Sequence, residues 1–208
     1  MKDVAAPGVD FKVNFSKELQ LASAKIAATP KQLEKAGQRA IKKTMRWMYS
    51  RAAREVSQLT GIPQKVLKFR FSLKTVGKGS EAVTILWIGI SPVLAEKAGK
   101  ARQTKKGVSL KKYRYEGAFV ADMYGYESAV WIRSSRNHSQ YTTTGKARKS
   151  NPNSLPAHLR GRFPVQHIAI DISDAATQAL KRLESRVPDE FRKKLDQELN
   201  YVVNHESA

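Results

Sequence analysis

The sequence predicts an α+β protein with a long N-terminal helix, a small and mainly antiparallel β-sheet of about four to five strands, and two C-terminal helices. Three observations predict this class. Apolar residues recur at helical spacing near the N-terminus, gather in short alternating or β-branched runs through the middle, and return to helical spacing after residue 172. Helical and extended patterns do not alternate along the chain, so a doubly wound parallel sheet is not expected.

Domain organisation is the first expectation. Residues 1–15 carry Pro7 and Gly8 near their start, and we expect them to form an irregular N-terminal arm. Residues 16–208 are expected to form a single α+β domain with long loops at 97–107 and 135–163, where no helical or strand periodicity is found.

Two helices open the predicted domain. Residues 16–28 carry apolar side chains on one helical face, and the tetrapeptide Thr29-Pro30-Lys31-Gln32 predicts the start of a second helix. Its threonine can cap the helix, its proline suits the first helical position, and its glutamine completes a capping box. The apolar stripe continues to Leu59, and Gly61 and Pro63 end it.

The middle of the chain changes to extended patterns, and the last part returns to helices. Leu67, Phe69, Phe71 and Leu73 alternate with polar residues, which is typical of a half-buried strand. We expect extended segments at 67–73, 81–90, 108–115, 117–123, 128–134 and 165–172, with turns at 77–79 and 124–126. Ser173 is expected to cap one helix, and Pro188 to start another.

The net charge of the chain is +20, and it is unevenly distributed. Residues 1–170 hold 32 Lys and Arg against 10 Asp and Glu, whereas residues 171–208 hold 6 against 8. A surface this basic repels itself, which implies a polyanion or an acidic protein as partner. We expect the balanced C-terminal segment to face protein or solvent.

Other compositional features exclude several classes of protein. The chain has no cysteine, so a disulfide scaffold and a cysteine-based zinc site are excluded. Residues 1–11 lack the basic start and apolar run of a signal peptide. The longest apolar run, Val83 to Ile90, is too short to span a bilayer, and we expect no membrane association.

Basic residues supply the candidate contacts with DNA or with an acidic partner. Lys35, Arg39, Lys42 and Arg46 form one stripe along the long helix, for which a solvated surface face is the alternative. The remaining candidates lie in two acid-free segments, 97–115 and 128–170: Arg102, Lys105, Lys106, Lys111, Lys112, Arg133, Arg136, Lys146, Arg148 and Lys149. Contact with phosphates, without reading of bases, is expected of such residues.

Patterns of catalytic chemistry are weak, and we expect no enzyme activity, no metal and no cofactor. The four histidines are scattered without metal-ligand spacing. The segment Gly77-Lys78-Gly79 matches no nucleotide-binding loop and is expected to be a turn. Asp171 and Asp174 could ligate metal in a small nuclease, but a helix N-terminus explains them better. Tyr113 and Tyr115 share one strand face, which favours packing over stacking on bases.

Three blocks of sequence resemble the minor tail protein Z family of long-tailed bacteriophages and prophages, in the same order over about residues 35–204. The first runs from Ala52 through Thr60-Gly61-Ile62-Pro63 to Arg70. The second comprises residues 101–109, 117–120 and 130–133, and the third comprises 162–165 and 199–203. Residues 134–161 depart from the family pattern, so no role is carried over to that loop.

The resemblance implies a structural protein of the virion that acts in tail completion at the head-proximal end of the tail, supporting head–tail joining and DNA passage. It implies a fold similar to other tail-completion proteins and assembly as a homo-oligomeric ring, with a hexamer as one candidate. Tail terminator, tail tube and head-completion connector proteins would be its partners, with phage duplex DNA in the channel as a further candidate. The alternative function is non-specific DNA binding by a free basic protein.

Overall fold

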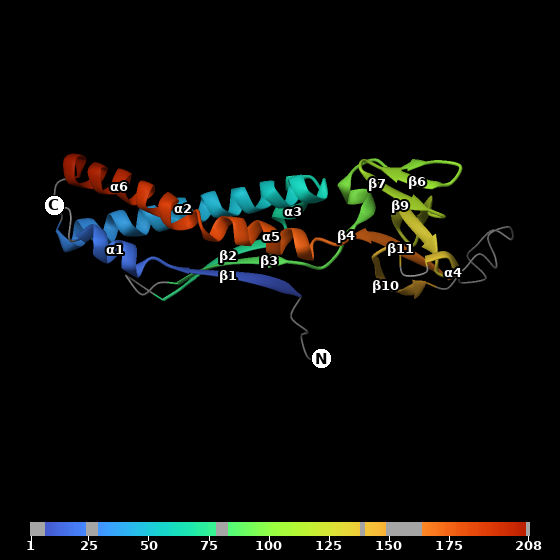
Figure 1. The fold of residues 1–208 in the computed structure, drawn as a ribbon, viewed down its shortest axis with the longest axis horizontal. Coiled ribbons are helices and arrows are strands. Elements are labelled where there is room, and N and C mark those ends of the chain that lie inside the picture. The colour runs from blue at the N-terminus through green and yellow to red at the C-terminus, as the bar shows by residue number, and fades with distance from the viewer. Residues whose placement is uncertain (1–6, 24–28, 78–82, 138–139, 149–163, 207–208) are drawn as a thin grey trace. The chain divides into compact units, whose positions relative to one another are not determined.

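The fold confirms the predicted α+β class, with helices before and after a region of strands (Figure 1). In a computed structural model of the chain, residues 7–23, 29–77, 83–137, 140–148 and 164–206 are described. Every strand pairing within these residues is antiparallel.

The contacts of the chain group into two compact units. Unit 1 comprises Met1–Glu55, Lys68–Gly89 and Ala175–Ala208, and unit 2 comprises Val56–Leu67 and Ile90–Asp174. A grouping of contacts does not establish how many domains fold cooperatively, so the single domain from residue 16 stays a prediction. The 31-residue helix α2 (Pro30–Thr60) contributes most of its length to unit 1 and its last turn to unit 2.

Unit 1 packs helices against one face of a three-stranded sheet of order β1–β3–β2. Phe15 and Phe191 stack at its centre with ring centroids 4.1 Å apart, and both are buried. Besides α2, its elements are β1 (Gly8–Asn14), α1 (Ser16–Ser23), β2 (Phe71–Val76), β3 (Val83–Gly89), α5 (Ser173–Glu184) and α6 (Val187–His205).

The N-terminal arm is not irregular throughout, because residues 8–14 form β1 and pair with the central strand β3. Phe11 lies opposite Leu86, and Val9 lies opposite Ile88, on the side of the sheet that carries the buried residues of β3. Alternating side chains place one apolar face toward the core, which stabilises the pairing. Pro7 and Gly8 precede or begin this strand rather than interrupt it.

The strand predicted at residues 67–73 is wrong in its first half. A short helix, α3 (Gln64–Lys68), buries Leu67, and β2 begins only at Phe71. Pro63 precedes this helix and its carbonyl accepts the N–H of Val66, which fits the preference of proline for helix starts. Phe69, which fits the apolar alternation, lies in the turn between α3 and β2 and is 84% exposed.

Unit 2 contains two further sheets. A five-stranded sheet has the order β10–β11–β9–β8, with β4 also paired to β11, and a three-stranded sheet has the order β5–β6–β7. Besides α3, its elements are β4 (Val93–Leu94), a 3-10 helix η2 (Ala95–Ala98), β5 (Arg102–Gln103), β6 (Gly107–Leu110), β7 (Tyr113–Glu116), β8 (Phe119–Met123), β9 (Tyr126–Arg133), α4 (Ser134–Asn137), β10 (Thr143–Arg148) and β11 (Val165–Ile170).

Several extended segments of unit 2 are divided differently from the prediction. The strand expected at 108–115 is a hairpin of β6 and β7, because Lys111 adopts φ 48° and turns the chain. The loop expected at 97–107 contains the end of η2 and the short strand β5. The loop expected at 135–163 contains α4 and β10, and its residues 149–163 lie outside the described part.

The strongest local signals are confirmed. The capping box at the start of α2 forms, since Gln32 Oε1 accepts the N–H of Thr29 at 2.9 Å and Thr29 Oγ1 accepts the N–H of Gln32 at 3.3 Å. Tyr124 and Gly125 form the two-residue turn between β8 and β9, with φ values of 56° and 80°. The capping box and the Tyr124-Gly125 turn therefore define the start of α2 and the boundary between β8 and β9, which the hydrophobic pattern alone does not define.

Gly61 ends α2 in the left-handed region with φ 71°, and its N–H donates to the carbonyl of Ser57 at 2.8 Å. Replacing it with alanine should lower the free energy of unfolding by about 1 kcal/mol, because a Cβ is unfavourable at this φ. Urea denaturation of Gly61→Ala measures the change. The control Gln58→Ala, at an exposed position of the same helix, should stay within about 0.5 kcal/mol of the parent chain. Equal stability of both variants would contradict the role assigned to Gly61.

Candidate functional site: the basic surfaces

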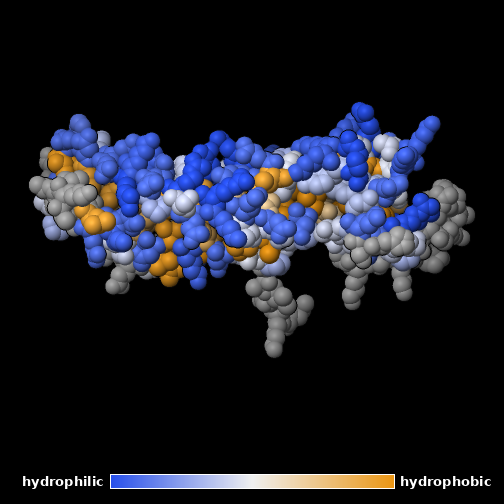
Figure 2. Space-filling view, in the orientation of Figure 1, coloured by the Kyte–Doolittle hydropathy of each residue, from blue (hydrophilic) through white to orange (hydrophobic). Residues whose placement is uncertain are grey.

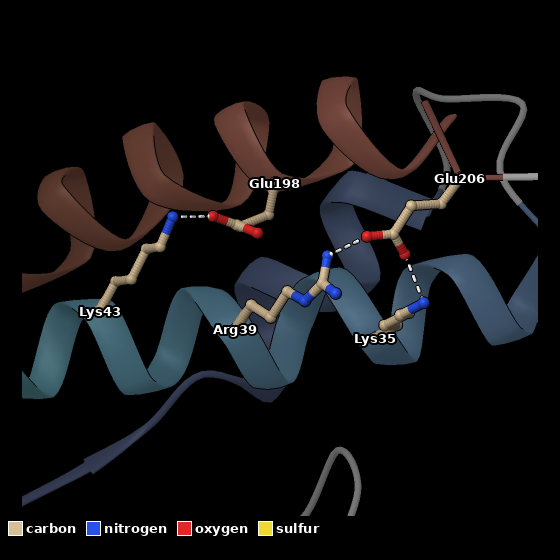
Figure 3. A network of polar contacts seen from close by, with 5 residues as sticks. All are labelled: Lys35, Arg39, Lys43, Glu198 and Glu206. Carbon is tan, nitrogen blue, oxygen red and sulfur yellow. Dashed lines mark hydrogen bonds and ion pairs between the residues drawn. The ribbon is translucent and has the colours of Figure 1, made fainter. Parts of the chain in front are cut away.

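The basic stripe of α2 lies in unit 1, where Glu198 of α6 and Glu206, the residue that follows α6, pair with bases of α2 (Figure 3). Lys35 and Arg39 both pair with the carboxylate of Glu206, with 2.7 Å between Arg39 Nη1 and Glu206 Oε1. About one helical turn after Arg39, Lys43 pairs with Glu198, a residue whose side chain is almost fully buried. The apolar side chains Phe191, Leu195, Leu199 and Val202 of α6 are buried in the core of the same unit.

These ion pairs shift the ionisation of both partners. Hydrogen bonds from Lys35 and then Arg39 hold the pKa of Glu206 below its usual range. The hydrogen bond to Glu206 raises the pKa of Arg39. The C-terminal segment was expected to face protein or solvent. Two of its carboxylates instead lie against the basic helix of the same chain, so half of the predicted stripe already has an acidic partner.

The other half of the stripe remains exposed. Lys42 and Arg46 have exposed side chains, and within the described residues no ion pair is found for either. They line an open hollow of about 560 Å³ together with Arg39, Lys43, Gln197, Glu198, Tyr201 and Glu206. The guanidinium of Arg39 lies 5.9 Å from the centre of the Tyr201 ring. This hollow has mixed charge, which makes it a weaker anion site than the sequence suggests.

The side chains of Lys111 and Lys112 contact the C-terminal end of α2 and Gly61, the residue that follows it. The ammonium of Lys111 donates to the carbonyl of Gly61 at 2.8 Å, and that of Lys112 donates to the carbonyl of Leu59. Tyr113 Oη donates to the carbonyl of Thr60 at 2.7 Å, and burial raises the pKa of this phenol. Cations and hydroxyl donors satisfy the free carbonyls at the negative end of a helix. These two candidates therefore have an intramolecular partner, and contact with DNA stays a prediction for them.

The face of the sheet β5–β6–β7 that carries Arg102 and Arg114 presents a group of exposed bases. In the strand register Arg102 lies opposite Ser109, and Ser109 lies opposite Arg114, so the three side chains form one row across the sheet. Lys105 and Lys106 project from the adjoining turn. An open hollow of about 570 Å³ over this face is lined by Arg102, Thr104, Lys105, Lys106, Gly107, Val108, Ser109, Arg114, Tyr115 and Glu116. We call the surface formed by Arg102, Lys105, Lys106, Ser109 and Arg114 the basic sheet face.

The turn that carries Lys105 and Lys106 is fixed by hydrogen bonds. The N–H of Thr104 donates to the carbonyl of Gly107 at 2.7 Å. The Gln103 side chain donates to the same carbonyl at 3.0 Å, and its Oε1 accepts the N–H of Val120 in the neighbouring strand β8 at 2.8 Å. A Cβ on Gly107 would lie 2.1 Å from the carbonyl oxygen of Tyr115, so only glycine allows this close pairing. The two lysines are thus held on a rigid support.

Arg114 belongs to the basic sheet face but was absent from the candidate residues. Its guanidinium donates to the carbonyls of Lys111 and Tyr113 at 2.7 and 2.9 Å, which fixes its direction. The signal that could have found it is its alternation with Tyr113 and Tyr115: if both tyrosines face the core, the residue between them faces outward.

The remaining candidates are dispersed over unit 2. Arg133 ends β9 and is half-buried opposite Val165, whereas Arg136 in α4 is exposed and its side chain packs over Gly117. Lys146 and Arg148 belong to strand β10. Lys149 lies outside the described residues. The structure therefore brings Arg102, Lys105 and Lys106 together, and it places Arg136 beside Gly117, whose N–H donates to the carbonyl of Lys106 at 2.9 Å.

No constellation typical of metal or nucleophile chemistry is present in the described part of the chain. Asp171 Oδ1 accepts the N–H and the hydroxyl of Ser173 at 2.8 and 2.7 Å, and these hydrogen bonds lower the pKa of Asp171. Asp171 thus binds the first residue of α5, whereas Ser173 itself was expected to cap this helix. Across residues 7–23, 29–77, 83–137, 140–148 and 164–206, no group of three or more His, Asp and Glu side chains could hold a metal ion.

A buried pair that sequence reasoning did not identify lies beneath the five-stranded sheet. His167 Nε2 lies 3.0 Å from Glu96 Oε2, and the imidazole stacks on Trp131 with ring centroids 4.4 Å apart. Tyr126 contacts the imidazole edge-on at 4.9 Å. The pair joins η2 to β11 and is enclosed by aromatic rings, which is the arrangement of a satisfied core histidine.

The surface is mostly hydrophilic on the face shown in Figure 2. Among the described helices, none combines the length and hydropathy that crossing a membrane requires. Fold and surface together define a strongly basic α+β protein that presents charged faces on fixed supports, the kind of surface expected of a component that contacts other macromolecules.

The chain belongs to the prophage minor tail protein Z family, whose sequence profile matches residues 17–206. The resemblance of the three sequence blocks is thereby confirmed over almost the whole chain. Membership makes this chain a bacteriophage minor tail protein with a structural role in the virion, in a family not known for enzymes. Neither the curated proteins nor the solved structures contain a match to it.

Loss of the Glu206 carboxylate should change how stability depends on pH. Because its folded-state pKa is lowered, Glu206 stabilises the fold fully above the ordinary glutamate pKa of about 4.3, and this contribution is lost as pH falls through the lowered value. Glu206→Gln should therefore lower Tm at pH 7, whereas at pH 3 its Tm should approach that of the parent chain.

Thermal unfolding followed by circular dichroism between pH 7 and pH 3 measures this difference. Asp189→Asn is the matched control, because Asp189 pairs with Arg192 on the exposed face of α6. The control should leave Tm and its pH dependence almost unchanged. An equal loss in both variants, or none in Glu206→Gln, would contradict the role of the Glu206 pairs.

Proposed function

We propose that this chain completes the phage tail at its head-proximal end, supports joining of head and tail, and contributes to the channel through which DNA passes. The family supports a structural role in the tail. The observation that carries the finer assignment is the basic sheet face, which places Arg102, Lys105, Lys106 and Arg114 on one exposed surface with Glu116 as the single acidic residue lining it.

The basic sheet face suits a polyanion better than a small ligand. Its bases lie on the two outer strands, β5 and β7, and on the turn between β5 and β6. Neighbouring strands lie about 4.8 Å apart, so the backbones of Arg102 and Arg114 are about 10 Å apart across the strand that carries Ser109. A surface of this width contacts several phosphates and reads no base sequence. The short fixed turn keeps Lys105 and Lys106 in place before a partner arrives, which reduces the entropy lost on contact.

The homo-oligomeric ring is part of the same proposal. A ring at the end of the tail would place the basic sheet face of each copy toward the channel or toward the next protein of the neck. The neighbouring proteins would be the tail terminator or tail tube on one side and a head-completion connector on the other, with acidic surfaces opposite the bases. A hexamer is one candidate for the ring, and the copy number would be measured on the assembled particle.

Non-specific DNA binding by the free chain is the second candidate function. The net charge of +20 and the basic sheet face favour it. A free DNA-binding protein would bind duplex DNA alone, with an affinity that falls steeply with salt and reflects the number of neutralised phosphates. Tail completion tolerates weak DNA binding but requires the chain in the particle.

Cryo-electron microscopy of purified virions distinguishes the two functions. Density for the chain at the head–tail junction, with the basic sheet face toward the channel, is the expected result. Absence of the chain from virions that are complete and infectious would reject the structural role at the junction and favour the free DNA-binding function.

Reversal of two charges on the basic sheet face should impair assembly of infectious particles. Lys105→Glu with Lys106→Glu replaces two exposed bases in a hairpin turn, so the fold should be retained while contact with an anionic partner is repelled. We expect the infectious titre in a complementation assay to fall at least about tenfold, with tails that fail to join heads.

The matched control is Lys181→Glu with Arg182→Glu, which changes the same net charge at two adjacent exposed bases of α5. Circular dichroism confirms folding of both double variants. A normal titre for Lys105→Glu with Lys106→Glu, or an equal loss in the control, would reject the specific role of the basic sheet face.

A further inference from the structure

Phe69 is an exposed aromatic side chain that unit 1 holds away from the core. Its side chain is 84% exposed, the largest fraction among the large hydrophobic residues of the described ranges. The carbonyl of Lys68 accepts a hydrogen bond from Tyr49 Oη at 2.9 Å, and the carbonyl of Arg70 accepts one from the N–H of Gly89 at 2.8 Å. Both flanking residues are thus tied to α2 and β3, and these bonds hold the backbone of the turn that carries Phe69.

An exposed phenylalanine on a fixed turn has the properties of an interface anchor. Aromatic anchors bring a large apolar area into contact, and a backbone that is already held in place loses little entropy on binding. Lys68, next to Phe69, is exposed and adds a positive charge beside the ring. The complementary surface would therefore be an apolar groove with an acidic rim.

Unit 1 contains such a groove between α1 and α2. It has a volume of about 390 Å³ and is lined by Leu19, Pro30, Leu33, Glu34, Gly37, Gln38 and Ile41. A Cβ on Gly37 would lie 2.8 Å from Leu19 Cδ2, so the glycine lets the two helices approach closely. Among the described residues that line it, Glu34 is the only charged one, and Gln38 Nε2 donates to Glu34 Oε1 at 3.3 Å.

We propose that Phe69 of one copy inserts into the α1–α2 groove of a second copy, with Lys68 beside Glu34. Matching polarity and opposite charge favour this occupant over an unrelated chain. The two surfaces share no residue, so each copy can use both at once, and such a head-to-tail contact propagates until it closes into a ring. The contact gives the surfaces of the proposed homo-oligomer and does not depend on where that oligomer lies in the tail.

Sedimentation velocity of the purified full chain over a range of concentrations tests the contact. The parent chain should self-associate, and Phe69→Ser should weaken association at least about 30-fold, as expected for removal of a central anchor. Val76→Ser, which removes another exposed apolar side chain, is the matched control and should associate like the parent. A parent chain that remains monomeric, or equal association of Phe69→Ser and the parent, overturns the proposal.

A charge exchange tests the pairing of the two surfaces directly. Lys68→Glu and Glu34→Lys are both changes at exposed positions, and each alone should weaken association about fivefold or more. The double variant should recover to within about threefold of the parent, because the opposite charges face each other again. Additive loss in the double variant would overturn the proposed pairing.

Mixing two defective chains separates a head-to-tail contact from a symmetric one. Phe69→Ser retains its groove, and Glu34→Lys with Leu33→Glu retains its Phe69, so an equimolar mixture should form dimers and no larger species. If neither the mixture nor the parent chain associates, the contact is rejected and the proposed role in the tail is unaffected. Association through these surfaces by a chain absent from virions rejects the role in the tail and leaves the contact standing.

Discussion

An excess of 38 Lys and Arg over 18 Asp and Glu must be folded into a chain of 208 residues without like charges being forced together. This electrostatic constraint is met in part by acidic residues that lie beside the bases of α2. Like charges at neighbouring helix positions are destabilising, and a long basic stripe such as that of α2 needs either solvent or acids beside it. The fold supplies acids, by placing Glu198 of α6 and the following Glu206 beside bases of α2.

Positive charge is used in three ways within the described residues. Glu198 and Glu206 neutralise bases of α2, and the ammonium groups of Lys111 and Lys112 bind backbone carbonyls at the C-terminal end of that helix. Bases in these two roles stabilise the fold. Arg102, Lys105 and Lys106 have no such role among the described contacts and line an open hollow, which is why that surface is the best candidate for an external partner.

The sequence predicted the elements whose determinants are local. The capping box at Thr29, the glycine stop at Gly61 and the apolar stripe between them specified α2, and Pro188 marked the start of α6. It could not predict β1, whose seven residues gain their stability from pairing with a strand some seventy residues later. The hairpin within residues 108–115 was missed for a related reason, because a left-handed lysine carries no strong turn signal.

The candidate site shows the same division between what is local and what is not. The charge of Lys35 and Arg39 is visible in the sequence, but the pairing with Glu206 joins positions about 170 residues apart, and no spacing rule predicts it. Phe69 matches the alternation of a buried strand residue, yet it is exposed in a turn whose backbone is held by hydrogen bonds at Lys68 and Arg70. Exposure that a fold maintains through bonds on both sides of a residue is evidence of use, because an unconstrained phenylalanine would gain free energy by turning toward the core. By the same argument, the hydrogen bonds that hold the turn of Lys105 and Lys106 make its exposure a property of the fold rather than of a loose loop.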